Sequence, residues 1–233
     1  MYPHDSHSQR TIRSLRLAGA YDRYVQIPEP EFLRKPSSEP PAAPRPAATV
    51  ILLRGGGERL EVLLVRRNPQ ARFMPGAWVF PGGSVGPEDG DGERGLRKGA
   101  IRELREEAGI ELDRDDELIA FARWITPVEA AMRFDTWFFL ARAPVGARPV
   151  VDGQEIVDHR WSTPAAALAA NAAGRLSLVF PTIKQLAQLA TFGNADDLLQ
   201  HARGMTVEPV QPRVLLTAGT ARIVLPGEPG YDS

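Results

Sequence analysis

Apolar and polar residues alternate in short runs from about residue 47 onward, and these runs predict a mixed α/β domain. Strands are predicted over residues 49–53, 60–65, 78–80, 117–126, 134–142 and 155–161. Helices are predicted over residues 95–108, 163–173, 182–189 and between Asn194 and Gly204, and a hairpin over 214–216 and 222–225. Mixed strands with helices on both sides predict an α/β/α sandwich with a mixed sheet, extra C-terminal helices and a hairpin.

The first 46 residues have a different composition. Residues 36–46 are rich in proline and predict an extended linker. The residues before them interleave isoleucine and leucine with arginine. We therefore expect an N-terminal tail and Pro-rich linker over 1–46, followed by one domain with a C-terminal helical extension over 47–233.

The most informative run is Arg102 to Ile110, which begins in the predicted helix over 95–108 and extends two residues past it. On a helix, Glu103, Glu106 and Glu107 fall on one face, and Leu104 lies on the opposite face. Like charges at these spacings repel each other, and a hard divalent cation would remove that repulsion. A solvated helix face with salt bridges is the alternative interpretation.

A Pro-Gly-Gly turn follows the short strand that begins at Trp78. Gly82 and Gly83 leave room for a ligand beside the backbone. Strand, turn, loop and acidic helix together resemble the Nudix hydrolase family, whose box is G-x5-E-x7-R-E-U-x-E-E-x-G-U, where U is a bulky aliphatic residue. Arg102 to Ile110 match the second half of the box at every specified position.

The resemblance implies a Nudix fold and metal-dependent hydrolysis of a nucleoside diphosphate linked to another group. It implies Mg²⁺ or Mn²⁺ as cofactor, held by Glu103, Glu106 and Glu107, with Arg102 as a catalytic partner of the carboxylates. Glu106 is the first candidate for the general base. Glu155 is the second, as a base or an additional ligand, and a solvated turn carboxylate is the alternative interpretation of Glu155.

The first half of the box departs from the family pattern, because the loop is five residues longer. Counting forward from Gly83, the first glutamate of the box falls on Asp89, whereas counting back from Arg102 it falls on Arg94. The acidic residues that compete for this role are Glu88, Asp89, Asp91 and Glu93.

The segment before the box resembles the signature of the coenzyme A diphosphatase branch, L-L-T-x-R-[SA]-x3-R-x3-G-x3-F-P-G-G, with Val65 and Asn68 as departures. Arg67 and Arg72 stand at its arginine positions, where they could pair with phosphate oxygens. Ordinary surface arginines flanking a strand are the alternative. The substrate-binding residues that we expect are Arg67, Arg72, Gly82 and Gly83. Further C-terminal runs resemble a subgroup that includes peroxisomal coenzyme A hydrolases of animals.

The function that we expect is cleavage of the pyrophosphate of coenzyme A or acyl-coenzyme A. Hydrolysis of ADP-ribose, NADH or a nucleotide sugar is an alternative, and a non-catalytic nucleotide-sensing Nudix module is another. The balanced charge, with a formal net charge of −1, argues against nucleic acid as a partner. Cysteine is absent, which excludes thiol catalysis. No apolar run approaches a membrane span, and no secretory signal is recognisable, so we expect a cytoplasmic enzyme with a small-molecule partner. Dimers are common in this superfamily, which makes a homodimer a further expectation.

Overall fold

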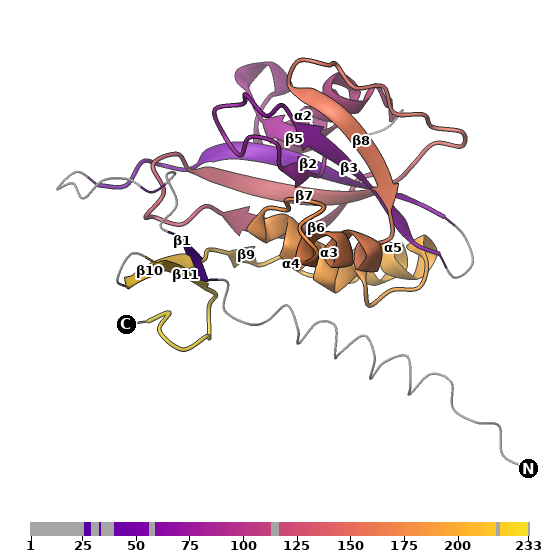
Figure 1. Cartoon of the computed structure of the whole chain (residues 1–233). Helices are drawn as coiled ribbons and strands as arrows, with labels where there is room; N and C mark the ends of the chain where they lie inside the picture. The colour runs from indigo at the N-terminus through magenta and orange to yellow at the C-terminus, as the bar shows by residue number, and fades with distance from the viewer. Residues whose placement is uncertain are drawn as a thin grey trace, which may run out of the picture.

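The computed structural model describes residues 26–28, 33, 40–55, 59–112, 117–217 and 220–232. Most of the predicted tail, and the predicted turns at 56–58 and 218–219, lie outside these residues. The described chain forms one eight-stranded mixed sheet with helices on both faces and a separate three-stranded sheet at one end (Figure 1). None of the described helices is long and apolar enough to cross a membrane.

The large sheet contains eight strands among the described residues. Its strands are β2 (Arg45–Arg54), β3 (Glu61–Arg67), β4 (Trp78–Val79), β5 (Gly82–Ser84), β6 (Ile119–Ile125), β7 (Phe134–Arg142), β8 (Ile156–Ser162) and β9 (Pro209–Val210). Strands β2 and β3 pair with each other as the predicted hairpin, but their registered pairs lie only at its turn end. Further along, β5 pairs with β2 and β4 pairs with β3, so the two strands have different neighbours there.

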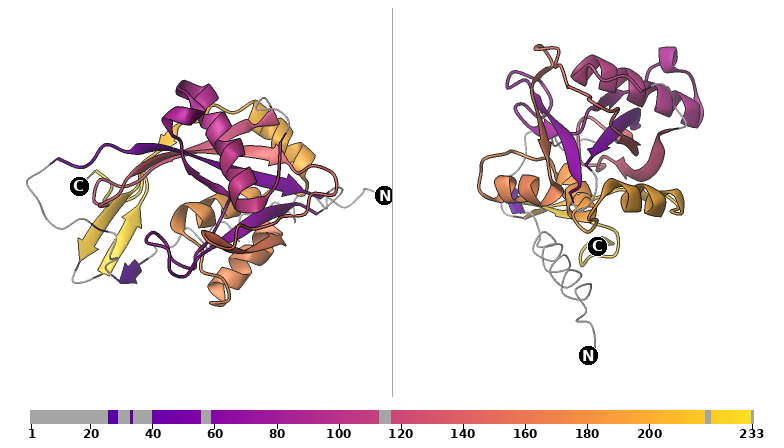
Figure 2. Two further views of the ribbon diagram at one scale, coloured as in Figure 1. Left: turned by 90° about the horizontal axis from the view of Figure 1, so that it is seen from above. Right: turned by 90° about the vertical axis from the view of Figure 1, so that its right-hand side faces the viewer.

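Alternating side chains of the strands supply two hydrophobic cores. In β2, Ile51 and Leu53 contribute to one core, whereas Val50 and Leu52 contribute to the other. The helices are α2 (Gly92–Ala108), α3 (Pro164–Ala172), α4 (Phe180–Leu189) and α5 (Ala195–Arg203). Helix α2 covers one face of the sheet, and α3, α4 and α5 cover the other (Figure 2). The predicted α/β/α sandwich with a mixed sheet is therefore confirmed.

The three-stranded sheet joins segments that are far apart in the sequence. It consists of β1 (Gln26–Pro28), β11 (Thr220–Val224) and β10 (Arg213–Thr217), in that order (Figure 2). Strands β10 and β11 form the predicted terminal hairpin. Strand β1, which lies within the residues assigned to the tail, pairs antiparallel with β11 because an edge strand offers unpaired backbone groups.

Several boundaries differ from the sequence prediction. Helix α2 begins at Gly92, three residues before the predicted start, because Asp91 takes an extended N-cap conformation and its carbonyl accepts from Gly95. Helix α4 begins at Phe180, with a proline in its first turn, instead of at residue 182. Strands β5 and β9 were not predicted, since they span three and two residues and carry no apolar run.

Candidate active site

Buried apolar residues in the second half of α2 hold this part of the helix against the sheet, and its acidic residues with it. Leu104 and Ala108 are fully buried against the sheet, as the helical periodicity predicts. The helix ends at Gly109, whose φ of 62° is left-handed and whose N–H donates to the Arg105 carbonyl over 2.9 Å. Glycine is favoured there because it has no Cβ to clash in this conformation.

Glu107 is the buried carboxylate of the site. Its side chain projects from α2 to the backbone of β5, where the Gly82 N–H donates to Glu107 Oε2 over 2.9 Å. Only 3% of the residue is exposed. Burial raises the pKa of Glu107 to about 8, and the charges of Glu103 and Glu155 act in the same direction, whereas the Gly82 hydrogen bond and Arg67 oppose it.

Gly82 and Gly83 allow close approaches by neighbouring atoms, and Gly82 also has a positive φ of 158° that favours glycine. A Cβ on Gly82 would lie 2.5 Å from the Ala48 carbonyl oxygen and 2.6 Å from the Thr49 Cα. A Cβ on Gly83 would instead lie 2.6 Å from the carboxylate of Glu103. The two glycines therefore allow β5 to lie against β2 and against the acidic face of α2.

Arg102 connects the acidic residues of α2 with the preceding 3₁₀ turn, η1 (Pro87–Asp89). Its guanidinium donates two hydrogen bonds of 2.9 Å to Asp89, one to Oδ1 and one to Oδ2. It also donates to Glu103, to Glu106 and to the Ser84 carbonyl, each over 2.9 Å. The hydrogen bonds from Arg102 lower the pKa of Asp89, which is buried.

This contact distinguishes among the four acidic residues that compete for the first acidic position of the box. Among the described residues, Asp89 is the one of the four that pairs with Arg102. The inserted residues lie between Asp89 and Arg102, where they form the first turns of α2. Sequence spacing alone could not make this choice, because the two directions of counting gave different residues.

The three glutamates of the box occupy different environments. Glu103 is largely buried, and burial raises its pKa, with Arg102 acting in the opposite direction. The Glu106 side chain is 50% exposed and bonds to Arg102. In the described part of the chain, no three acidic, histidine or cysteine side chains are already arranged to hold a metal ion. The three predicted metal ligands are thus not yet grouped around one point. Glu103 and Glu106 instead both accept hydrogen bonds from the Arg102 guanidinium.

Glu155 approaches the site from the start of β8. It is exposed, and its charge acts on both Glu103 and Glu107 by raising their pKa values. Asn68 fixes the neighbouring turn, because its backbone N–H donates to the Glu155 carbonyl over 2.8 Å and its side-chain amide to the Gln154 carbonyl over 2.7 Å. In the sequence, Asn68 stands out only as a departure from the branch signature. That gives no sign of its hydrogen bonds to the carbonyls of Gln154 and Glu155.

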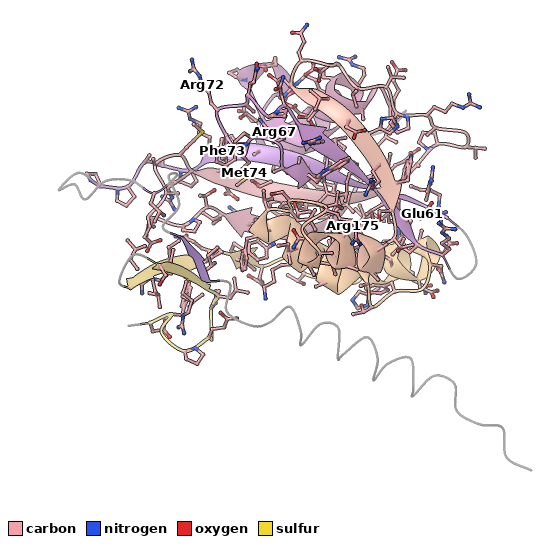
Figure 3. All side chains as sticks on the ribbon, in the orientation of Figure 1. Glu61, Arg67, Arg72, Phe73, Met74 and Arg175 are labelled. Carbon is pink, nitrogen blue, oxygen red and sulfur yellow. The ribbon has the colours of Figure 1, made fainter. Side chains whose placement is uncertain are left out.

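The structure separates the two arginines of the signature. The Nε of Arg67 donates to the Phe73 carbonyl over 3.1 Å, and its charge lowers the pKa of Glu107. Arg67 also lines a cavity of about 160 Å³ together with Gly82. Arg72 is exposed and points away from the domain, whereas Arg67 is half-buried (Figure 3). Of the expected substrate-binding residues, Arg67, Gly82 and Gly83 therefore lie beside the acidic face, and Arg72 is on the exposed surface.

Comparisons with known proteins agree with this geometry. "Putative nudix hydrolase 7" of Caenorhabditis elegans is 28% identical over 80% of this chain and 74% of its own length. "Peroxisomal coenzyme A diphosphatase ndx-8" of the same organism is 45% identical over 31% of this chain, and human "Acyl-coenzyme A diphosphatase NUDT19" is 32% identical over 48% of it. These matches span only 30% and 31% of those two relatives.

A solved structure and a family model extend the comparison. The crystal structure of a NUDIX hydrolase from Alicyclobacillus acidocaldarius superposes with a TM-score of 0.61 at 26% identity, covering 68% of this chain and 96% of that one. The family model described as NUDIX domain matches residues 43–182, which is more than half of the sequence. This range includes β2, the glycines of β5 and the whole acidic helix, and the chain therefore belongs to the Nudix family and is a Nudix pyrophosphohydrolase.

Proposed function

We propose that this enzyme hydrolyses the diphosphate of coenzyme A or acyl-coenzyme A with the help of Mg²⁺ or Mn²⁺. The observation that carries the proposal is the position of Glu107, which is buried under the Gly82 N–H with Glu103 and Glu155 close enough to raise its pKa. Carboxylates that lie close together repel one another, which raises the free energy of the folded protein. A cation bound between them would remove this repulsion.

The donor chemistry of the site fits a hard divalent cation. Glu103 and Glu107 offer carboxylate oxygens next to the backbone of β5, and Glu106 or Glu155 would complete the set. Such a cation, when bound, would neutralise phosphate charge and make a bound water more acidic. Glu106 Oε2 accepts a hydrogen bond from Arg102, so a cation at that oxygen would compete with Arg102.

The other residues of the site would bind the substrate and move a proton. Arg67 lies at the cavity beside Gly82, where its guanidinium would pair with phosphate oxygens. A carboxylate would take the proton from the attacking water, and Glu106 and Glu155 are the two candidates. A glutamine at the true base should lower kcat by about 100-fold or more, whereas a glutamine at the other position should cost less.

Coenzyme A is favoured over other diphosphates by two observations. The Arg67 position of the branch signature lies at the acidic face. Two of the relatives are named as coenzyme A or acyl-coenzyme A diphosphatases, although they match only part of the chain. ADP-ribose, NADH and nucleotide sugars would meet the same carboxylates, so substrate choice has to be measured.

Product analysis tests the proposal directly. The enzyme would be incubated with coenzyme A, acetyl-coenzyme A, ADP-ribose, NADH and a nucleotide sugar, each with Mg²⁺ and with Mn²⁺, and products identified by mass spectrometry. We expect 4′-phosphopantetheine and 3′,5′-ADP from coenzyme A, and no product from Glu107→Gln. Glu93→Gln is the matched control, since Glu93 is exposed on the same helix and pairs with Arg97.

Three results would decide against parts of the proposal. Cleavage of a different diphosphate with coenzyme A intact would keep the chemistry and reject the substrate. If Arg67→Ala cleaves every diphosphate as fast as the unaltered enzyme does, Arg67 has no role in substrate binding. Tight nucleotide binding without turnover with either metal would favour a sensing module.

A further inference from the structure

A largely apolar cavity of about 330 Å³ lies on the face of the sheet opposite α2. Strands β6 and β7 form its roof, the start of α4 forms one wall, and the β10–β11 hairpin closes another, as their arrangement in Figure 1 allows the reader to follow. We call this cavity the apolar chamber. Its volume falls at the lower end of the range for ligand pockets, about 300 to 1,000 Å³.

The chemistry of the chamber wall excludes strongly polar ligands. None of the described lining residues is charged, and their only hydroxyl groups belong to Thr126 and Thr136. The Thr126 hydroxyl already accepts a hydrogen bond of 3.0 Å from the Phe134 N–H. A nucleobase would leave most of its hydrogen-bonding groups without partners here, which costs free energy. A chain of methylene groups would not.

The chamber adjoins a second, smaller cavity that two residues of the candidate active site line. The cavity of about 160 Å³ that Arg67 and Gly82 line shares seven wall residues with the chamber. The shared residues are Phe73, Met74, Thr126, Thr136, Phe138, Val179 and Pro181. Phe73 and Met74 lie at this junction, next to Arg67 (Figure 3). A substrate whose phosphates lie near Gly82 could therefore direct its pantetheine arm past Phe73 and Met74, so that an acyl group at the end of that arm enters the chamber.

The mouth of the chamber carries an apolar side chain in contact with water. Met132, which lines the chamber, is 45% exposed. Flexible, polarisable methionine side chains adapt to apolar ligands of different shape. Burial of Met132 by a bound chain would add to the apolar area removed from water.

We propose that the apolar chamber binds the fatty acyl chain of an acyl-coenzyme A, so that the enzyme prefers medium-chain thioesters such as decanoyl-coenzyme A to free coenzyme A. The inference rests on the proposed function, because it assumes a substrate whose diphosphate lies at the acidic face. It goes further by assigning a binding site to α4 and the β10–β11 hairpin, most of which lie beyond the matched family domain.

The first test is the dependence of kcat/KM on acyl-chain length. Each methylene group that enters the chamber should raise kcat/KM by up to about fourfold, until the cavity is filled. We expect kcat/KM for decanoyl-coenzyme A to exceed that for acetyl-coenzyme A by about tenfold or more. A flat profile from free coenzyme A to decanoyl-coenzyme A would overturn the proposal.

The second test fills the chamber. Ile183→Trp on α4 and Ile223→Trp on β11 each place a larger side chain at a lining position. We expect both variants to reduce the decanoyl preference to about twofold or less. Gln188→Trp is the control, because Gln188 is exposed on the same helix, and it should keep the full preference. An equal loss of kcat/KM for free coenzyme A and all thioesters would mean that the shared part of the substrate occupies the chamber, and the proposal would fail.

A binding measurement separates this inference from the proposed function. Titration calorimetry with decanoate should show saturable binding that both tryptophan variants abolish and Gln188→Trp retains. If decanoate binds in this way but no coenzyme A is cleaved, the chamber assignment stands and the proposed substrate fails. If coenzyme A is cleaved but decanoate does not bind, or binds equally to all variants, the substrate stands and the chamber assignment fails.

Discussion

Identical side chains acquire different properties in this site because their surroundings differ. Glu103, Glu106 and Glu107 lie within five residues of one helix, yet Glu107 is buried, Glu103 is largely buried and Glu106 is half exposed. The sequence placed all three on one face, since helical geometry depends only on spacing. It could not separate them, because burial is set by β5 and by Arg102. The sequence motif therefore identifies the carboxylates but not their protonation.

Glu107 should give the metal-free enzyme a characteristic pH dependence. Its pKa is raised from 4.5 to about 8 in the folded state, so between these values the folded chain holds a proton that the unfolded chain has released. The free energy of unfolding should therefore fall as pH rises from about 5 to 8, by up to about 5 kcal/mol at about 1.4 kcal/mol per pKa unit. Urea unfolding in chelator would measure it, and Glu107→Gln should show a much flatter profile. Equal slopes for both proteins would contradict the assignment.

The two adjacent glycines should respond differently to alanine. In Gly83→Ala the new methyl group meets the end of a flexible side chain, Glu103, which can move aside. We expect stability within about 1 kcal/mol of the unaltered protein but a loss of activity of about 100-fold or more, because Glu103, a proposed metal ligand, is displaced. In Gly82→Ala the methyl group meets the backbone of β2, and unfolding free energy should fall by about 3 kcal/mol or more. Full activity of Gly83→Ala would show that Glu103 need not stay where it is.

Among elements, the contact between η1 and α2 holds the acidic helix in place. Asp89 is buried, and its described partners are Arg102 and the Gly86 N–H. Arg102→Ala should lower the free energy of unfolding by about 3 to 5 kcal/mol, because it leaves a buried carboxylate without its cation. Asp89→Asn in the Arg102→Ala background should recover part of that loss. A double-mutant cycle in urea would measure the coupling, and additive losses would mean that the pair contributes little.

The helices that the sequence predicted well are those with clear capping residues. Helices α3 and α5 have the predicted caps, with Thr163 and Asn194 each accepting a backbone hydrogen bond. The start of α2 was predicted wrongly, because the glycine- and aspartate-rich run before it has no apolar period to mark a helix. Strand β5 was read as a turn, since two glycines carry no strand signal and their pairing depends on β2.

At the scale of the whole molecule, metal binding and folding should be coupled. A cation that binds only the folded state adds about 2.7 kcal/mol when its concentration is 100 times the Kd. For a chain of this size that should raise Tm by about 5 to 10 °C. Thermal unfolding with Mg²⁺, with Mn²⁺ and with chelator would test it. Glu107→Gln should lose the shift and Glu208→Gln, an exposed control, should keep it. A shift of the same size in Glu107→Gln would place the cation elsewhere.

The overall architecture was more predictable than the contacts between elements that form the site and the chamber. Strand and helix runs were enough for the sandwich, and the box was enough for the family. The apolar chamber was not foreseen, because its walls come from β6, β7, α4 and the hairpin, which are far apart in the sequence. Only the packing of these elements brings Phe73, Val179 and Ile223 to the wall of one cavity.

The pairing of Asp89 with Arg102 has a consequence for how such enzymes are recognised in genomes. The residues between these two positions form a segment whose two ends are joined by the ion pair, and α2 takes up the added length away from the carboxylates. Insertions at this point can thus accumulate during evolution while the geometry around Glu107 is preserved. A search pattern with fixed spacing through the whole box will overlook chains of this kind. A pattern that fixes only the second half, and lets the distance to the acidic partner vary, will retrieve them.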